Sequence, residues 1–144
     1  MSHNKDEQLA VLESITHDDR EKLIKCSQKI QFTAGEMLVN VGENDEGVFI
    51  LMVGSVEVVS KGAFGMDKVI AEIHQGSIFG ELSFFDQQPR IAAVKARSNG
   101  FALHITPNGL KRLAASDPDL AMQLLLGFGK ILSTRFRKTA SGGI

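Results

Sequence analysis

Cysteine, basic charge and long hydrophobic runs are all scarce in this chain of 144 residues. The single cysteine, Cys26, excludes an internal disulfide and a thiolate metal site. Lys and Arg number 16 against 17 Asp and Glu, so the basic excess typical of duplex-binding domains is missing. No apolar run approaches transmembrane length, and the N-terminus lacks a signal-peptide pattern. We therefore expect a cytoplasmic protein that binds neither nucleic acid nor a membrane.

Clustered metal ligands and nucleophile motifs are also missing. His74 and His104 fall on separate segments, His3 and His17 lie outside residues 30–106, and no His-x-His pair occurs. A metal-dependent jelly-roll enzyme needs clustered ligands. A haem or iron–sulfur sensor needs cysteines or an axial-ligand context, and a Ser/His/Asp hydrolase needs a nucleophile elbow. We predict that the chain is not an enzyme and holds no metal or cofactor.

The middle of the chain, residues 30–106, consists of short apolar runs separated by glycines. Runs such as MLVNV, VFILMV, VEVV and IAAVKA are typical of many short antiparallel strands joined by tight turns. Val56 and Val58 alternate with Glu57, as expected of a half-buried strand. This pattern predicts an antiparallel β-roll, that is, a double-stranded β-helix or jelly roll.

Helical patterns precede the roll, over residues 6–29. Thr16 is predicted to start a capping box with Asp19, although Glu or Gln is the usual partner at that position. Cys26 lies in the helical segment KLIKCSQKI, so we expect a buried structural thiol rather than a reactive one.

Helical patterns also follow the roll, over residues 108–139, before a flexible tail at 140–144. Asn108 is predicted to cap one helix, and Asp117 to cap the next with proline at its first position. One face of the last helix carries residues at three- and four-residue steps: Leu120, Leu124, Phe128, Ile131 and Arg135. The prediction is one α+β domain over residues 1–144, a β-roll with short N-terminal helices and a long C-terminal helix.

The most informative segment is 79–94, FGELSFFDQQPRIAAV. It resembles the phosphate-binding cassette of cyclic-nucleotide-binding domains, typically F-G-E-L/M-A/S, a short spacer, then P-R-x-A-x-V. That family includes the catabolite activator protein, the regulatory subunits of cyclic AMP-dependent kinase, and cyclic-nucleotide-gated channels. The glycine spacing upstream, with the helices on either side, extends the resemblance to about residues 9–138.

The resemblance implies a set of ligand-binding residues in the cassette: Phe79, Gly80, Glu81, Leu82, Arg90, Ile91 and Ala92. The planar guanidinium of Arg90 can pair with two phosphate oxygens, and the amide of Ile91 is a further donor. Glu81 would accept a hydrogen bond from the ribose 2′-OH, and Gly80 lets the backbone approach the ligand. A plain surface ion pair between Glu81 and Arg90 is the alternative.

Residues outside the cassette complete the implied site. Val58 and Ile70 fall where the family places an apolar bed for the purine and sugar, with ordinary core packing as the alternative. Arg135, or else Phe136, is placed to cover the base from the last helix. A solvated basic face at the helix C-terminus is the alternative for Arg135.

The cassette departs from the family pattern at Ile91, where a small or hydroxylated residue is usual. Ile91 and Ala93 offer no hydroxyl to a guanine amino group, so the sequence favours cyclic AMP over cyclic GMP. Two other hypotheses stay open. In the first, the domain is a degenerate interaction module without nucleotide. In the second, it binds a cyclic dinucleotide, which no specific feature of the sequence supports.

The output of the domain is expected at its C-terminal helix. By resemblance, ligand draws the cassette inward and pulls that helix over the base, which regulates an effector partner or a fused effector domain. Gly127 and Gly129 suit either a hinge or the close approach of a second helix in a homodimer. Whether the chain stands alone or is the sensory piece of a longer protein is open at this point.

Overall fold

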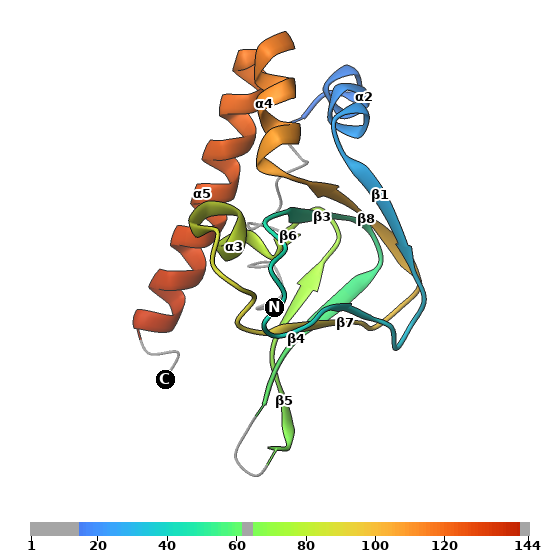
Figure 1. The fold of residues 1–144 in the computed structure, drawn as a ribbon, viewed down its shortest axis with the longest axis vertical. Helices are drawn as coiled ribbons and strands as arrows, with labels where there is room; N and C mark the ends of the chain where they lie inside the picture. Colours follow the sequence, from blue (N-terminus) through green and yellow to red (C-terminus); the bar gives the residue numbers. More distant parts are fainter. Residues whose placement is uncertain (1–14, 62–64, 142–144) are drawn as a thin grey trace.

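Two antiparallel sheets form a roll in the computed structural model, which describes residues 15–61 and 65–141 (Figure 1). The first sheet has the strand order β1 (Gln28–Phe32), β8 (Gly100–Ile105), β3 (Val48–Val53) and β6 (Ile78–Phe79). The second has the order β2 (Met37–Val39), β7 (Ala93–Ala96), β4 (Ser55–Lys61) and β5 (Asp67–His74). The predicted antiparallel β-roll is confirmed.

Helices cover one side of this roll (Figure 1). They are α2 (His17–Lys25), α3 (Glu81–Asp86), α4 (Pro107–Ser116) and α5 (Pro118–Ala140). The long helix α5 runs beside the strands, and α3 lies between α5 and the roll. The predicted inner face of α5 is confirmed, because Leu120, Leu124, Phe128 and Ile131 are all buried there.

Strand β3 is buried on both faces, which explains its uninterrupted apolar sequence VFIL. Val48 and Ile50 pack into the core under the helices, whereas Phe49 and Leu51 pack into the roll interior. This alternation follows from the period of two along a strand. His104 on β8 pairs with Phe49 in register, and the two ring centroids are 4.7 Å apart. A polar ring therefore lies beside the apolar interior of the roll.

The N-terminal predictions are confirmed in part. Thr16 caps α2, because its side chain accepts the amide of Asp19 at 3.1 Å. Cys26 is buried, its thiol donates to the Leu23 carbonyl at 3.2 Å, and burial raises the pKa of that thiol. This environment suits a structural thiol. The helical assignment through residue 29 is wrong at its end, since β1 begins at Gln28, and residues 6–14 lie outside the described residues.

The boundary of α4 corrects the sequence prediction. Its N-cap is Thr106, whose hydroxyl accepts the amide of Gly109 at 3.0 Å, and the prediction of Asn108 is wrong. The residue before a proline is driven to extended backbone, which is the conformation of an N-cap, so Pro107 places the cap at Thr106. Asp117 does cap α5, as predicted, by accepting the amide of Leu120. That helix continues through Ala140, so the tail predicted from residue 140 begins too early.

Thr106→Ala is expected to lower the free energy of unfolding by about 1 kcal/mol, because a donor at the start of α4 loses its acceptor. Asn108→Ala is the matched control, since Asn108 is exposed inside the first turn and does not cap. Urea denaturation of the two variants measures the difference. An equal or larger loss in Asn108→Ala would contradict this helix boundary.

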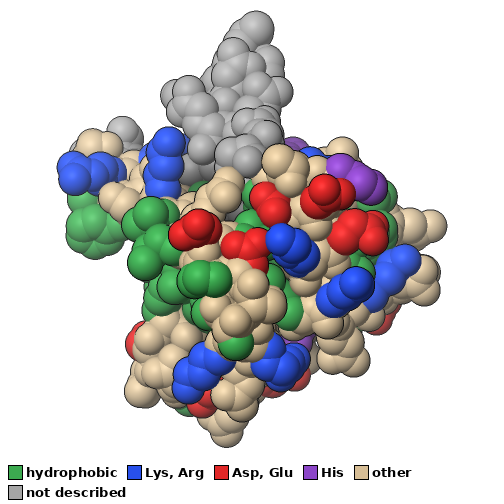
Figure 2. Space-filling model, turned by 90° about the horizontal axis from the view of Figure 1, so that it is seen from above, with side chains coloured by type: hydrophobic (Ala, Val, Ile, Leu, Met, Phe, Trp, Pro, Cys, Tyr) green, Lys and Arg blue, Asp and Glu red, His purple; other side chains and the backbone are tan. Residues whose placement is uncertain are grey.

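The surface of the protein carries charge of both signs. Figure 2 shows one face on which Asp and Glu side chains lie next to Lys and Arg side chains. Arg97 pairs with Glu72 at 3.1 Å, and Lys22 pairs with Asp117 at 2.8 Å. Exposed pairs of this kind add little stability. In the part of the chain that the structure describes, no helix has both the length and the hydropathy to span a bilayer.

Candidate functional site

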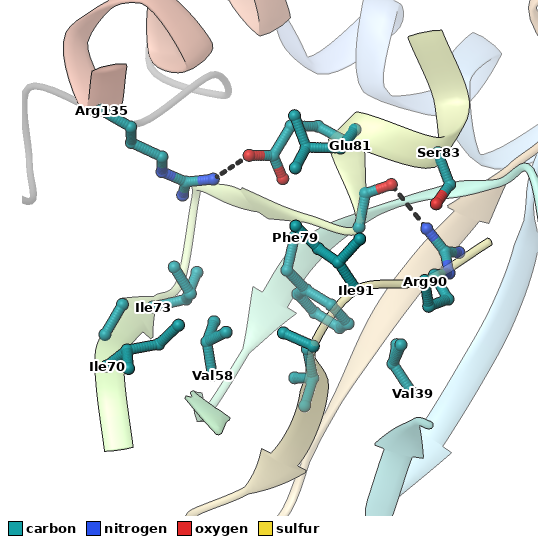
Figure 3. A pocket seen from close by; sticks show the side chains of 15 residues that line it. Val39, Val58, Ile70, Ile73, Phe79, Glu81, Ser83, Arg90, Ile91 and Arg135 are labelled. Carbon is teal, nitrogen blue, oxygen red and sulfur yellow. Dashed lines mark hydrogen bonds and ion pairs between the residues drawn. The ribbon is translucent and has the colours of Figure 1, made fainter. Parts of the chain in front are cut away.

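A pocket of about 240 Å³ lies among the second sheet, α3 and α5 (Figure 3). All ten residues that the sequence predicts for ligand binding line it: Val58, Ile70, Phe79, Gly80, Glu81, Leu82, Arg90, Ile91, Ala92 and Arg135. The lining also includes residues that sequence reasoning did not single out, namely Val39, Ala71, Ile73, Ser83 and Val94. The fold thus brings the predicted residues together around a single cavity.

Arg90 is the buried cation of this pocket, with a side chain only 3% exposed. Its Nη1 donates to the Gly80 carbonyl at 2.7 Å, and its Nη2 donates to the Gly47 carbonyl at 2.7 Å. Nη2 also lies 3.0 Å from a carboxylate oxygen of Asp45. Its Nε is buried and has no hydrogen-bond partner among the described residues. A buried donor without a partner is costly, so Nε is the donor of Arg90 that an added acceptor would satisfy.

Gly80 is required by the close approach of Arg90. A Cβ at this position would come within 2.8 Å of Nη1 of Arg90. The residue also has φ +76°, in the left-handed region that favours glycine. Gly80 is directly followed by α3, and the first residues of α3, Glu81 to Ser83, line the pocket.

Glu81 and Arg135 form a second charged group at the pocket (Figure 3). Nη1 of Arg135 donates to a Glu81 carboxylate oxygen at 2.9 Å, and Nη2 donates to the Ile78 carbonyl at 2.9 Å. The side chains of Arg135 and Glu81 are 23% and 11% exposed, so the solvated basic face considered for Arg135 is wrong. The surface ion pair between Glu81 and Arg90 is also wrong, because each side chain pairs with a different partner.

The remaining wall of the pocket is apolar. Val58 packs against the roll interior while lining the cavity, so it takes part in both core and pocket. Ile70 is 54% exposed, which excludes ordinary core packing for it. Ile91 is 73% exposed although it lines the pocket, which places it at the rim. Phe136, the alternative cap, is 71% exposed, whereas Arg135 lines the cavity.

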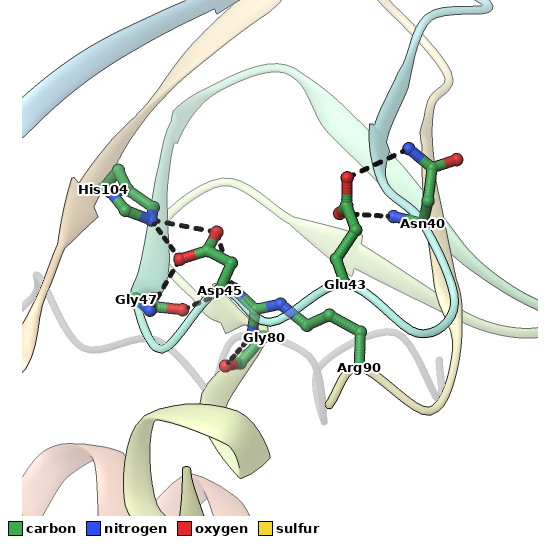
Figure 4. Close-up of polar contacts among 7 residues, drawn as sticks. All are labelled: Asn40, Glu43, Asp45, Gly47, Gly80, Arg90 and His104. Carbon is green, nitrogen blue, oxygen red and sulfur yellow. Dashed lines mark hydrogen bonds and ion pairs between the residues drawn. The ribbon is translucent and has the colours of Figure 1, made fainter. Parts of the chain in front are cut away.

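Sequence reasoning missed Asp45 and Gly47, two of the three residues that hold the guanidinium of Arg90. Asp45 accepts the Gly47 amide at 2.9 Å and lies 3.0 Å from Nε2 of His104 (Figure 4). Burial by itself raises the pKa of Asp45, but the Gly47 amide, His104 and Arg90 together outweigh burial and lower that pKa. The sequence signal that could have found His104 is the alternation along β8, which puts His104 on the same face as Ala102, inside the roll.

A roll whose pocket combines a buried arginine, a carboxylate and an apolar wall has the character of a binding domain for a small anionic ligand. Among the described residues, no three His, Cys, Asp or Glu side chains gather as a metal site would require. Residues 29–117 match the family model described as the cyclic nucleotide-binding domain. The chain therefore belongs to the cyclic nucleotide-binding domain family, as its motif at 79–94 predicts.

Curated relatives agree with this membership, and a solved structure shares the fold. The chain is 28% identical over 107 residues to the cAMP-dependent protein kinase regulatory subunit of Emericella nidulans, covering 74% of this chain and 25% of that protein. It is 28% identical over 112 residues to the cAMP-activated global transcriptional regulator CRP of Pasteurella multocida, covering 77% and 54%. The crystal structure of a cyclic nucleotide-binding domain from Methylobacillus flagellatus superposes with a TM-score of 0.78 at 23% identity, covering 88% and 71%. The chain thus spans between a quarter and about half of these two curated relatives.

Proposed function

We propose that this pocket binds a cyclic mononucleotide, with cyclic AMP preferred, and that the domain is a sensor rather than an enzyme. The observation that carries the proposal is Arg90, a buried cation at the pocket wall whose Nε finds no acceptor in the described part of the chain. A cyclic phosphate offers one negative charge on oxygens that accept charge-assisted hydrogen bonds. Such a ligand offers a charged acceptor to the unpartnered donor of Arg90.

The remaining chemistry of the pocket fits the rest of a nucleotide. The carboxylate of Glu81 is an acceptor for ribose hydroxyls, and the first amides of α3 add donors for the phosphate because they have no partner within the helix. Val58 and Ile70 give an apolar bed for a purine. The two relatives described above are both named for cyclic AMP, which supports the same ligand class.

The proposed preference for cyclic AMP rests on the lack of a side-chain hydroxyl at the pocket rim. Ile91 lines the pocket with an apolar side chain, and Ala93 follows it without a hydroxyl. A guanine amino group that enters such a site without an acceptor loses a hydrogen bond to water. Adenine avoids that loss. Because the effect concerns this one rim position, we propose a modest preference for cyclic AMP over cyclic GMP.

Isothermal titration with cyclic AMP and cyclic GMP in parallel tests the proposal. We expect a dissociation constant in the micromolar range for cyclic AMP, about −8 kcal/mol, and weaker binding of cyclic GMP. The open-chain 5′-AMP is the matched ligand control, since it keeps base and sugar but lacks the cyclic phosphate. If neither cyclic nucleotide binds, the domain is an interaction module without nucleotide, and Ile91 is the first residue to replace by serine.

Ligand binding is proposed to reach an effector through α5. Arg135 of this helix holds Glu81, the carboxylate that the ribose would use. Ribose hydroxyls at Glu81 change that contact, so the bound and free states differ in how the end of α5 is held. A helix shifts only as far as the ligand affinity differs between the two states. An effector protein, or an effector domain on the same chain, is the proposed recipient.

A second copy of this chain is the proposed partner of the outer face of α5. Met122, Gly129 and Phe136 recur every seven residues, with Leu125 and Leu132 between them, which is the spacing of a paired helix. Met122 is 57% exposed and Phe136 is 71% exposed, so the two ends of this stripe are open to a second copy, while Leu125 packs partly against the core.

Gly129→Glu is expected to turn a dimer into a monomer. A Cβ at Gly129 meets no atom of the described residues within 4 Å, so the added side chain fits this part of the chain and is expected to obstruct a second helix. Sedimentation velocity of wild type and variant measures the change, with Lys111→Glu on α4 as the control. A wild-type monomer at all concentrations would contradict this dimer.

A further inference from the structure

His104 occupies a position where the fold calls for an apolar side chain. On β8 the buried residues Leu103 and Ile105 face the helices, while Ala102 faces the roll interior. His104 shares the side of Ala102, with a side chain 15% exposed and its ring tilted against Phe49. Burying a polar ring costs free energy unless a partner satisfies it. Its partner is the carboxylate of Asp45.

The contact between His104 and Asp45 is closely held. Nε2 of His104 lies 3.0 Å and 3.1 Å from the two carboxylate oxygens of Asp45. The imidazole also lies flush against Gly47, where a Cβ would overlap the ring. Gly47 in turn donates its amide to Asp45 and gives its carbonyl to Arg90. Ring, carboxylate and backbone thus fix one another.

Asp45 contacts the guanidinium of Arg90 at Nη2 (Figure 4). Asp45 does not line the cavity, whereas Arg90 does. Nη2 of Arg90 pairs with Asp45 and donates to the Gly47 carbonyl. Within residues 15–61 and 65–141, Nε is the donor of Arg90 left without a partner. The orientation of Asp45 therefore decides which edge of Arg90 is available to a phosphate.

We propose that His104 is a positioning residue for the phosphate, acting through Asp45 on Arg90, and that its protonation strengthens nucleotide binding. This inference rests on the proposed function. A neutral imidazole orients Asp45 by a hydrogen bond, and an imidazolium also adds a positive charge behind Arg90. The added charge favours an anionic ligand.

Two charged groups stand near the ring of His104. Asp45 and, beyond it, Arg90 are the charged groups of the described loops that face the ring. Phe49 faces it from β3 and Gln28 is its register partner on β1, and neither of these titrates. The lowered pKa of Asp45 keeps that carboxylate ionised at neutral pH, and arginine stays charged.

Cyclic AMP titrations of wild type and His104→Gln, between about pH 8 and about pH 6, test the proposal. Wild type is expected to bind about threefold to tenfold more tightly at the lower pH. His104→Gln keeps an N–H donor for Asp45 without a titrating charge. It is therefore expected to match wild type at the higher pH and to show less than about a twofold change. His74→Gln, an exposed histidine on β5, is the control and keeps the wild-type pH dependence.

Failure of this inference and failure of the proposed function give different results. Wild type that binds cyclic AMP equally at both pH values overturns this inference and leaves the proposed function standing. Wild type that binds no nucleotide overturns the proposed function. The ¹⁵N signal of the Arg90 Nε–H in the free protein then tests the inference alone. It is expected to move with pH in wild type and to stay fixed in His104→Gln, and the same movement in both overturns the role of His104.

Discussion

Arg90→Ala is expected to abolish measurable binding of cyclic AMP, a loss of at least about a hundredfold in affinity. The variant removes the buried cation and the unpartnered Nε that the phosphate would use. Isothermal titration measures the loss. Arg135→Ala is expected to lose less, because Arg135 contacts Glu81 and not the proposed phosphate position. Wild-type affinity in Arg90→Ala would remove Arg90 from the binding site.

Arg90→Ala is also expected to lower the free energy of unfolding, by about 1–3 kcal/mol, because buried acceptors lose their donor. Those acceptors are the carbonyls of Gly47 and Gly80. Circular dichroism with urea denaturation separates this effect from lost affinity. Arg97→Ala is the matched control, since Arg97 pairs with Glu57 and Glu72 at the surface. It is expected to change both stability and binding little.

Phe128→Ala is expected to lower the free energy of unfolding by about 3–5 kcal/mol, the usual cost of deleting a buried aromatic ring. Phe128 on α5 is fully buried, and its ring meets Phe84 of α3 edge-on with centroids 5.9 Å apart. The deletion leaves a cavity between the two helices. It also loosens α3, which carries Glu81 and Ser83 in the pocket wall, so weaker cyclic AMP binding is expected as well.

Phe136→Ala is the control for Phe128→Ala, because it deletes the same ring from the same helix at a position 71% exposed. Its unfolding free energy is expected to stay within about 0.5 kcal/mol of wild type. Both variants are to be unfolded in urea at a protein concentration where they are monomeric. Equal losses would mean that α5 does not pack against α3 through Phe128.

Local sequence patterns predict much of the fold and of the candidate site. The period of two and the glycine turns predict the strands, because a strand alternates its side chains whatever its neighbours are. The cassette at 79–94 predicts the family, because its residues lie within one short segment. Where the local reading erred, a neighbouring residue decided the outcome. Pro107 moved the cap of α4 from Asn108 to Thr106 by restricting the backbone before it.

By itself, then, the sequence determined the strand pattern, the cassette and the identity of its cation. Only the tertiary structure decided which distant residues contact that cation and the other polar side chains around it. Arg90 bonds to Gly47 across 43 positions, His104 meets Asp45 across 59, and Arg135 meets Glu81 across 54. Such pairs have no local signature, because sheet register and the packing of α5 bring them together. The same register places His104 inside the roll, where burial requires the partner that Asp45 provides.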